Sequence, residues 1–394
     1  MRTETARLAP DFSRPVHCLL GLPIDAVDLT GAEGRIRTAA ARRSPCFLST
    51  PNVNFLVACQ SDAVFRNSVI DSDLSVADGM PLVWLGKLIG IPLRERVAGA
   101  ALFDALRYRP GQRLSVYFFG GPEGVAELAG RKLDLEGRGL TCAGYESPGF
   151  GSLDEMSTDE VIQRINASRA DVLLVSLGAR KGQAWIERNR KRLTIPVISH
   201  LGAVLHFAAG TLRRAPAWMQ RCGLEWLWRI KEEPGLWRRY YADGRALAAL
   251  LVTRVLPYAW YSRRHRPDLA RLAAARVETR NEREAYVVRL QGAWTQSNIA
   301  RLRRCFHHAA LAGKDVRLET SDVTHVDSAF VGLVMLLQGH QRQHGRRLLV
   351  PSIPEAVRRV LGYCCADFLC ADTAPARELP VALEGAVLSD DVRP

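Results

Sequence analysis

The first half of the chain alternates short apolar runs with longer segments of helical periodicity. The apolar runs are rich in β-branched and aromatic residues, and the pattern extends from His17 to about Leu212. Such alternation predicts an α/β fold with a Rossmann-like, mostly parallel sheet and helices on both of its faces. The expected strands are 46–49, 74–77, 114–120, 171–178 and 196–202.

Polar residues stand directly after two of these strands. The turn Thr50-Pro51-Asn52 follows the first strand, and Asp78-Gly79 follows the second. The carboxyl ends of parallel strands meet at one edge of a sheet, where open α/β folds bind ligands. We therefore expect the candidate site at this edge, with Asp78 as its principal carboxylate.

Two interpretations of Asp78 are open from the residues alone. A carboxylate at a strand end in a partly desolvated cleft can have its pKa raised towards neutrality, which suits a general base acting on a hydroxyl. Alternatively, the sequence Asp-Gly-Met-Pro suits the start of a helix, with Asp78 as its N-cap.

Other side chains nearby are suited to a sugar or a phosphate. Thr50, Asn52 and Asn54 offer donors and acceptors for sugar hydroxyls or a phosphate, although turn chemistry explains them equally well. Arg94 and Arg96 suit bidentate binding of a diphosphate, although isolated surface arginines are common.

The motifs for cofactors are weak. Gly120-Gly121 and Gly178 end two strands and permit close approach of a nucleotide, but neither forms the GxGxxG fingerprint of dinucleotide-binding folds. The sequence Asp71-Ser72-Asp73 has the spelling of a DxD metal site, yet it precedes an apolar run instead of following it. His200 is the one histidine near a strand end that is a candidate for a pocket.

The segment from Thr211 to Tyr241 combines aromatic and basic side chains. Four tryptophans and two tyrosines are interleaved with seven Lys and Arg, which suits a membrane interface. The next segment, 246–261, is short for a span and contains Arg254 and Pro257, so we expect a helix lying against protein or bilayer. An ordinary amphipathic packing helix is the alternative.

The net charge of +13 is concentrated in the middle of the chain. Between Arg213 and Arg283, 16 Lys and Arg outnumber 7 Asp and Glu. Such a patch binds anionic lipid, nucleic acid or a phosphorylated substrate, or is a solvated helical surface. No helix-turn-helix or RNP-like pattern accompanies it, so no nucleic-acid partner is expected.

At 394 residues the chain is long enough for two domains. After Glu284, further β/α alternation predicts a small α/β unit without a catalytic constellation. No long apolar run or signal peptide is seen, so we expect a cytoplasmic protein with its nine cysteines reduced. The predicted division is a disordered lead (1–16), an α/β domain (17–212), a basic and aromatic appendage (213–262), a charged linker (263–283), a small α/β domain (284–378) and a tail (379–394).

Six motifs follow one another between residues 17 and 242. They are TPNVNF at 50–55, ADG at 77–79, RVAG at 96–99, FFGG at 118–121, LGARKGQAWI at 177–186 and the Arg- and Trp-rich segment at 213–240. Together they closely resemble the WecG/TagA/CpsF glycosyltransferases, glycosyltransferase family 26. The resemblance implies an inverting transferase that needs no metal or other cofactor. It would move a hexose or N-acetylmannosamine-type sugar from a UDP-sugar to a polyprenyl-diphosphate-linked saccharide in cell-surface polysaccharide assembly, as a peripheral protein on the inner face of the membrane.

The resemblance also implies roles for particular residues. Asp78 would deprotonate the acceptor hydroxyl, with Thr50 beside it in the cleft. Arg96 and Gln183 would bind the donor or its diphosphate. The full set of expected substrate-binding residues is Asn52, Asn54, Arg96, Gly120, Gly121, Gln183 and Gly202. Arginines of the appendage would contact the membrane and the acceptor and complete the active site: Arg214, Arg221, Arg229, Arg238 and Arg239.

One motif departs from the family pattern. Members usually read GxPxQE where this chain has ARKGQA at 179–184, so the Pro and the Glu after Gln183 are missing. The departure bears on the identity of the donor sugar.

The second unit, about 284–373, resembles a STAS domain through the sequence DVTHVDSAFVGLVMLL. The usual phosphoacceptor position is occupied by Ala329, so a kinase-driven switch is not expected, whereas binding of a protein partner or nucleotide is. The alternative to an enzyme is a regulatory STAS protein whose transferase-like domain binds UDP-sugar without turnover.

Overall fold

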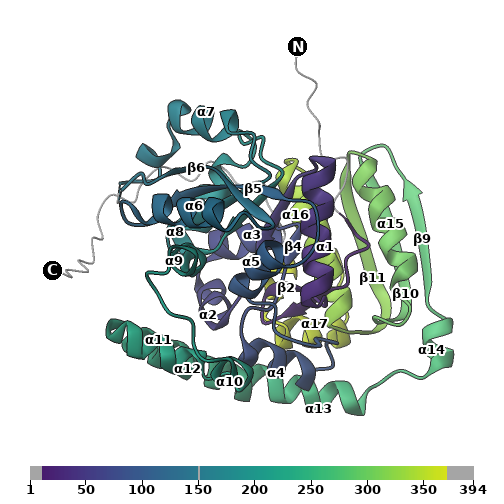
Figure 1. Cartoon of the computed structure of the whole chain (residues 1–394). Helices are drawn as coiled ribbons and strands as arrows, with labels where there is room; N and C mark the ends of the chain where they lie inside the picture. The colour runs from purple at the N-terminus through teal and green to yellow at the C-terminus, as the bar shows by residue number, and fades with distance from the viewer. Residues whose placement is uncertain (1–10, 150, 371–394) are drawn as a thin grey trace.

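The computed structural model of the chain describes residues 11–149 and 151–370, so the predicted tail at 379–394 lies outside it. Figure 1 shows two α/β units side by side, the first drawn in purple to teal and the second in green to yellow. A row of helices from the middle of the chain runs along one side of the molecule. Within the ranges described, no helix is both long enough and apolar enough to cross a membrane.

The first unit is built on a six-stranded parallel sheet. Its strands are β3 (Cys46–Ser49), β4 (Leu74–Ser75), β5 (Leu114–Gly120), β6 (Leu140–Glu146), β7 (Val172–Ser176) and β8 (Val197–His200). They are arranged in the order β4-β3-β8-β7-β5-β6, with every neighbouring pair parallel. All five expected strands are present. The sixth, β6, lies at the sheet edge and is only partly buried, so it lacks the apolar run that marks the others.

Helices cover both faces of this sheet, which confirms the predicted fold class. On one face Leu48 and Phe118 belong to a core with α1, α5, α6 and α9, and on the other Phe47 and Phe119 belong to a core with α7 and α8. The alternation follows from the strand period of two. The helices are α1 (Leu29–Arg42), α2 (Val53–Ser61), α3 (Ala63–Ile70), α4 (Met80–Leu88), α5 (Gly99–Tyr108), α6 (Val125–Glu136), α7 (Asp159–Ala167), α8 (Ala179–Asn189) and α9 (Gly202–Ala209).

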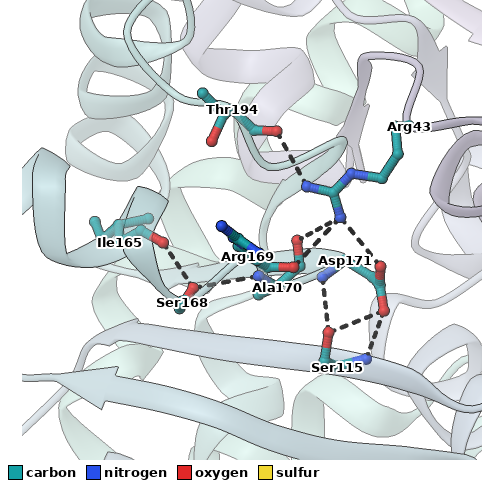
Figure 2. A network of polar contacts seen from close by, with 8 residues as sticks. All are labelled: Arg43, Ser115, Ile165, Ser168, Arg169, Ala170, Asp171 and Thr194. Atoms are coloured by element: carbon teal, nitrogen blue, oxygen red, sulfur yellow. Dashed lines mark hydrogen bonds and ion pairs between the residues drawn. The ribbon is translucent and has the colours of Figure 1, made fainter.

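A polar network joins the starts of the central strands, at the edge opposite the strand ends that carry the motifs. Arg43, the residue after α1, donates hydrogen bonds to the Asp171 carboxylate and to the carbonyl oxygens of Ala170 and Thr194 (Figure 2). Asp171 in turn accepts from the backbone N–H and the hydroxyl of Ser115, each at 2.9 Å. The network fixes β5 and β7 relative to α1, so this edge is structural.

The appendage is a chain of helices: α10 (Ala217–Arg221), α11 (Glu225–Glu232), α12 (Trp237–Leu250), a π-helical turn (Leu251–Val255) and α13 (Leu256–Arg264). The segment expected as a surface helix at 246–261 lies against protein on one side, where Tyr258 and Tyr261 are buried. Its other side exposes Val252, Leu256 and Trp260. The helix row therefore presents an apolar stripe outwards.

The second unit is a four-stranded sheet in the order β12-β11-β10-β9 with four helices. Its elements are α14 (Leu269–Ala273), β9 (Arg276–Asn281), β10 (Ala285–Trp294), α15 (Ala300–Leu311), β11 (Asp315–Val326), α16 (Ser328–Gln343), β12 (Leu348–Leu349) and α17 (Glu355–Tyr363). The predicted linker at 263–283 is therefore misplaced, because β9 pairs antiparallel with β10 and begins the sheet at Arg276. Charged side chains made β9 look like linker, since five of its six residues are exposed on an edge strand.

The two units share one hydrophobic core. A hairpin near the N-terminus, β1 (Val16–Leu19) and β2 (Leu22–Asp25), packs against α16, and its residues belong to the same cluster as those of the second sheet. A Cβ atom on Gly332 of α16 would lie 2.9 Å from the backbone of His17. The helix is buried on nearly all sides because it lies between this hairpin and its own sheet.

The start of the chain is also part of this core, contrary to the prediction of a disordered lead over 1–16. Phe12 and Arg14 are buried, and Arg14 forms an ion pair with Asp25 at 2.7 Å. The ring of Phe12 packs against Phe306, which lies far along the chain, so the local pattern gave no sign of this contact. Residues 1–10 of the expected lead lie outside the described part of the chain.

Candidate active site

The loops that follow β3 and β4 meet the start of α5 around Asp78. The backbone N–H of Asp78 donates to the carbonyl of Pro51 at 2.8 Å, which holds the two loops together. The N–H of Gly99 donates to Asp78 Oδ2 at 3.3 Å. A Cβ atom on Gly99 would lie 3.7 Å from the Thr50 methyl group and 2.5 Å from the Leu201 side chain. Three of the sequence motifs thus converge, as expected for strand ends of one sheet.

Asp78 is not the N-cap of the next helix. Gly79 holds the N-cap position of α4, with φ of 149° and no side-chain hydrogen bond to the helix. The Asp78 carboxylate instead accepts from Gly99, which begins α5. The structure therefore removes the interpretation of Asp78 as the N-cap of α4.

The environment of Asp78 raises its pKa from 3.8 to about 6. The main cause is loss of hydration, since the side chain is half-buried at the junction of the loops. The Arg96 guanidinium and the Gly99 N–H oppose this shift by stabilising the ionised form, whereas the Glu225 carboxylate adds to it. A carboxylate with a pKa near 6 is ionised at neutral pH and still basic enough to accept a proton.

The charges of two arginines lower the pKa of Asp78, and each of these arginines forms an ion pair with another carboxylate. Arg96 forms an ion pair with Glu225 of α11. Arg214, at the start of the appendage, forms an ion pair with Asp104 of α5 and donates to Gln220 Oε1 at 3.1 Å. Sequence reasoning missed both carboxylates, although Glu225 lies inside the GLEW stretch of the sixth motif. By contrast, the Arg94 side chain is exposed.

The asparagines expected to bind substrate make structural hydrogen bonds. Asn52 caps α2, its side chain accepting from the N–H of Phe55 at 3.3 Å. Asn54 Nδ2 donates to Asp243 Oδ2 of α12 at 3.2 Å, so it joins the appendage to the sheet domain. Both asparagines lie near the site, but no described contact joins either side chain to Asp78.

Gln183 lies beneath the strand ends. Its side chain is 1% exposed and donates from Nε2 to Ser49 Oγ at 3.1 Å. Gln183 Oε1 has no hydrogen-bond partner among the described residues, and neither has Nε2 of His200, which is also buried. Burial lowers the pKa of His200 to about 4, so this imidazole is neutral. These two unpaired polar atoms lie at the same end of the sheet as Asp78.

The glycines expected at the site shape the strand ends. Gly120 has φ of 104°, and a Cβ atom there would lie 2.5 Å from the Ser176 carbonyl oxygen of the neighbouring strand. Gly121 donates its N–H to that same oxygen at 2.8 Å. Gly202 begins α9, and its carbonyl accepts from Ser176 Oγ at 2.9 Å. Substitution at Gly120 would push β5 and β7 apart.

Arg229, Arg238 and Arg239 of the appendage make no described contact with Asp78. Arg229 pairs with Glu233 one turn along, at 2.8 Å. Arg238 and Arg239 are exposed and lie over the rings of Trp237 and Tyr240, at 5.7 and 5.3 Å from the ring centres. The side chain of Arg221 lies outside the described residues.

A cavity of about 260 Å³ lies next to this cluster, between α5 and α9, and Asp104 and Arg214 form part of its wall. A larger one of about 610 Å³ lies at the seam between the two units, near α1 and α16. Asp78 lines neither. Among the described residues, no three His, Cys, Asp or Glu side chains are grouped to hold a metal ion, and the Asp71 carboxylate of the DxD motif pairs with Arg342 at 2.6 Å.

The fold and site define a class of protein: a Rossmann-like α/β protein with a partly desolvated carboxylate and two arginines gathered beside the strand ends of its sheet. Comparison with known proteins gives the family. Residues 17–260 match the model of the glycosyl transferase WecG/TagA/CpsF family, and the chain belongs to it. Residues 277–367 match the model of the Mlab, STAS domain, which agrees with a second sheet beginning at Arg276.

Three relatives carry the name N-acetylglucosaminyldiphosphoundecaprenol N-acetyl-beta-D-mannosaminyltransferase. The protein from Bacillus spizizenii is 29% identical over 206 residues, 52% of this chain and 78% of its own length. The Bacillus subtilis protein is 25% identical over 193 residues, 49% and 73% of the two chains. One from Staphylococcus aureus is 24% identical over 224 residues, 56% and 85%.

Proposed function

We propose that this protein transfers a hexose or N-acetylmannosamine-type sugar from a UDP-sugar to a polyprenyl-diphosphate-linked saccharide, with Asp78 as the general base. The observation that carries the proposal is the Asp78 carboxylate, with a pKa raised to about 6 and Arg96 acting on it. The names of the relatives support the choice of acceptor and of an N-acetylmannosamine-type donor. The product would serve cell-surface polysaccharide assembly.

In the proposed reaction, the acceptor hydroxyl donates its proton to Asp78 while its oxygen attacks the anomeric carbon of the donor. The bond from that carbon to the diphosphate oxygen breaks, and UDP leaves with the bonding electrons. Arg96 stabilises the charge that develops on the leaving diphosphate. The Gly99 N–H orients the carboxylate, and Thr50 lies beside the same loop. The reaction so described uses no metal.

The exposed side of the appendage supports membrane docking on the inner, anionic face. Large apolar side chains are exposed along α10 to α13 and on the adjacent α4: Trp84, Trp218, Trp226, Leu227, Trp237, Tyr241, Val252, Leu256 and Trp260. Arg238 and Arg239 lie among them. Interfacial tryptophans with flanking arginines suit the boundary of an anionic bilayer. A polyprenyl acceptor would be presented at this boundary.

The shared core bears on both membrane docking and the binding of a protein partner. Deleting everything after Arg213 would remove more than half of the common core, so membrane docking has to be tested by substitution. A protein partner of the STAS-like unit would bind a face other than α16, because α16 is buried between the two units. Because this helix is covered, the structure does not support the alternative in which the STAS-like unit is a regulatory domain that binds partners through α16.

The proposal is tested by incubating the full-length protein with a panel of UDP-sugars and a polyprenyl-diphosphate-linked N-acetylglucosamine, and identifying the lipid-linked product by mass spectrometry. We expect one donor to be transferred, and Asp78→Asn to reduce the rate by ~10²-fold or more. The matched control is Asp268→Asn, which keeps an N-capping side chain on helix α14 of the second unit. Absence of any lipid-linked product, or equal rates in the two variants, would contradict the proposed function.

A further inference from the structure

The charges around Asp78 are not arranged to receive a diphosphate. Arg96 is paired with Glu225, and Arg214 is paired with Asp104. Counting Asp78 itself, three carboxylates surround two guanidinium groups. A diphosphate carries several negative charges and requires guanidinium groups with free donors. A diphosphate therefore competes with a carboxylate for each of these two arginines.

Of the two carboxylates, Glu225 is on the more loosely attached element. Asp104 belongs to α5, which packs in the core of the sheet domain through Leu102, Phe103 and Leu106. Helix α11 contributes no fully buried residue. The Arg96–Glu225 pair itself is only partly shielded, with 13% of the arginine side chain and 23% of the glutamate side chain exposed.

The turn before α11 gives the helix a fixed pivot. Gly223 has φ of 72°, and a Cβ atom there would lie 2.9 Å from Met80 and from the Trp84 ring on α4. The turn therefore stays close to α4, while the helix beyond it has few anchors. Trp226 and Leu227, directly after Glu225, are 42% exposed.

We infer that Glu225 is a gating carboxylate, which occupies at Arg96 the place that the diphosphate of the donor takes, and which is displaced when that diphosphate binds. The inference rests on the proposed function in taking Arg96 as a donor-binding residue. Glu225 would act through Arg96 and not on the reacting atoms. In the protein without donor, Glu225 neutralises Arg96. When the diphosphate replaces Glu225 at Arg96, helix α11 is released from the sheet domain.

The test is binding of UDP, and separately of inorganic pyrophosphate, to the full chain by isothermal titration calorimetry. Glu225→Gln removes the competing charge and keeps the size of the side chain, so both ligands should bind about fivefold more tightly than to the wild type, as expected for breaking a partly shielded ion pair. Glu232→Gln, at an exposed position of the same helix, should leave the affinity unchanged. Adding Glu225→Gln to Arg96→Gln should give no gain over Arg96→Gln alone.

The outcomes separate this inference from the proposed function. If UDP binds the wild type and Glu225→Gln equally well, or the variant more weakly, Glu225 is not a gate, and the transferase proposal stands. If Glu225→Gln gains affinity for pyrophosphate but no protein binds UDP, the gate stands and the UDP-sugar donor is wrong. If neither ligand binds any of the proteins, both are wrong.

A second measurement uses the wild-type protein and does not depend on how a variant folds. Hydrogen exchange of the backbone amides in α11 should become faster when UDP is saturating, because Glu225 has lost its partner. Unchanged or slower exchange of α11 under saturating UDP would overturn the gate.

Discussion

Asp78→Asn should make the protein more stable at neutral pH while it slows catalysis by ~10²-fold or more. Asparagine is close in size to aspartate, and its amide oxygen can still accept the Gly99 N–H. The substitution removes the cost of an ionised carboxylate that has been withdrawn from water. With a pKa of about 6 in the folded protein and 3.8 as its ordinary value, that cost is about 3 kcal/mol at pH 7.5.

The sign follows from the direction of the shift. Because folding raises the pKa of Asp78, its favourable contribution is fully present below pH 3.8 and is lost as pH rises through about 6. The free energy of unfolding of Asp78→Asn should therefore exceed that of the wild type by about 3 kcal/mol at pH 7.5 and converge with it near pH 4. Urea titrations of both proteins at pH 4, 5.5 and 7.5 check this. A difference that is constant with pH, or a less stable variant at pH 7.5, would refute the assignment of a desolvated carboxylate.

Three further predictions concern the shared core and the appendage. Gly332→Ala should lower the free energy of unfolding by about 1–3 kcal/mol in urea titration, because its methyl group would press on the His17 backbone; an increase, the usual result of Gly to Ala in a helix, would count against that contact. Asp327→Ala should cost about 1–2 kcal/mol by the same measurement, since it removes the N-cap of α16, and Asp327→Asn should restore most of it. Val252→Glu with Trp260→Glu should reduce co-sedimentation with phosphatidylglycerol vesicles several-fold without changing the circular dichroism spectrum, and undiminished sedimentation would exclude this stripe from membrane docking.

The sheet of the first unit could be predicted from sequence because its strands are buried on both faces. Such strands form continuous apolar runs, and all five runs proved to be strands. Two edge strands were not predicted: β6, which is partly exposed, and β9, which is charged. The core shared by the two units could not be predicted either, because it depends on contacts between residues far apart in the sequence. One example is the hydrogen bond between His17 Nδ1 and Ser328 Oγ, at 3.1 Å.

Some residues of the candidate site could likewise be predicted from sequence, whereas others could not. Asp78, Thr50 and Arg96 follow strand ends or adjoin them, so the topology of a parallel sheet brings them to one edge. Asn52 and Asn54 share this edge, but their hydrogen bonds to a helix cap and to α12 depend on local backbone geometry and on a distant partner. Glu225 could not be found by position in the sheet, because its place beside Arg96 results from the way the appendage folds back.

The central claim is that Asp78 accepts the proton in sugar transfer, and the pH dependence of kcat/KM for the lipid-linked acceptor tests it most directly. For the wild-type protein we predict a rate that rises tenfold per pH unit below about pH 6 and levels off above it, in keeping with the raised pKa of Asp78. Asp78→Asn should be slower by ~10²-fold or more on the plateau and lack that rise. A variant that keeps the wild-type profile would contradict the role of Asp78.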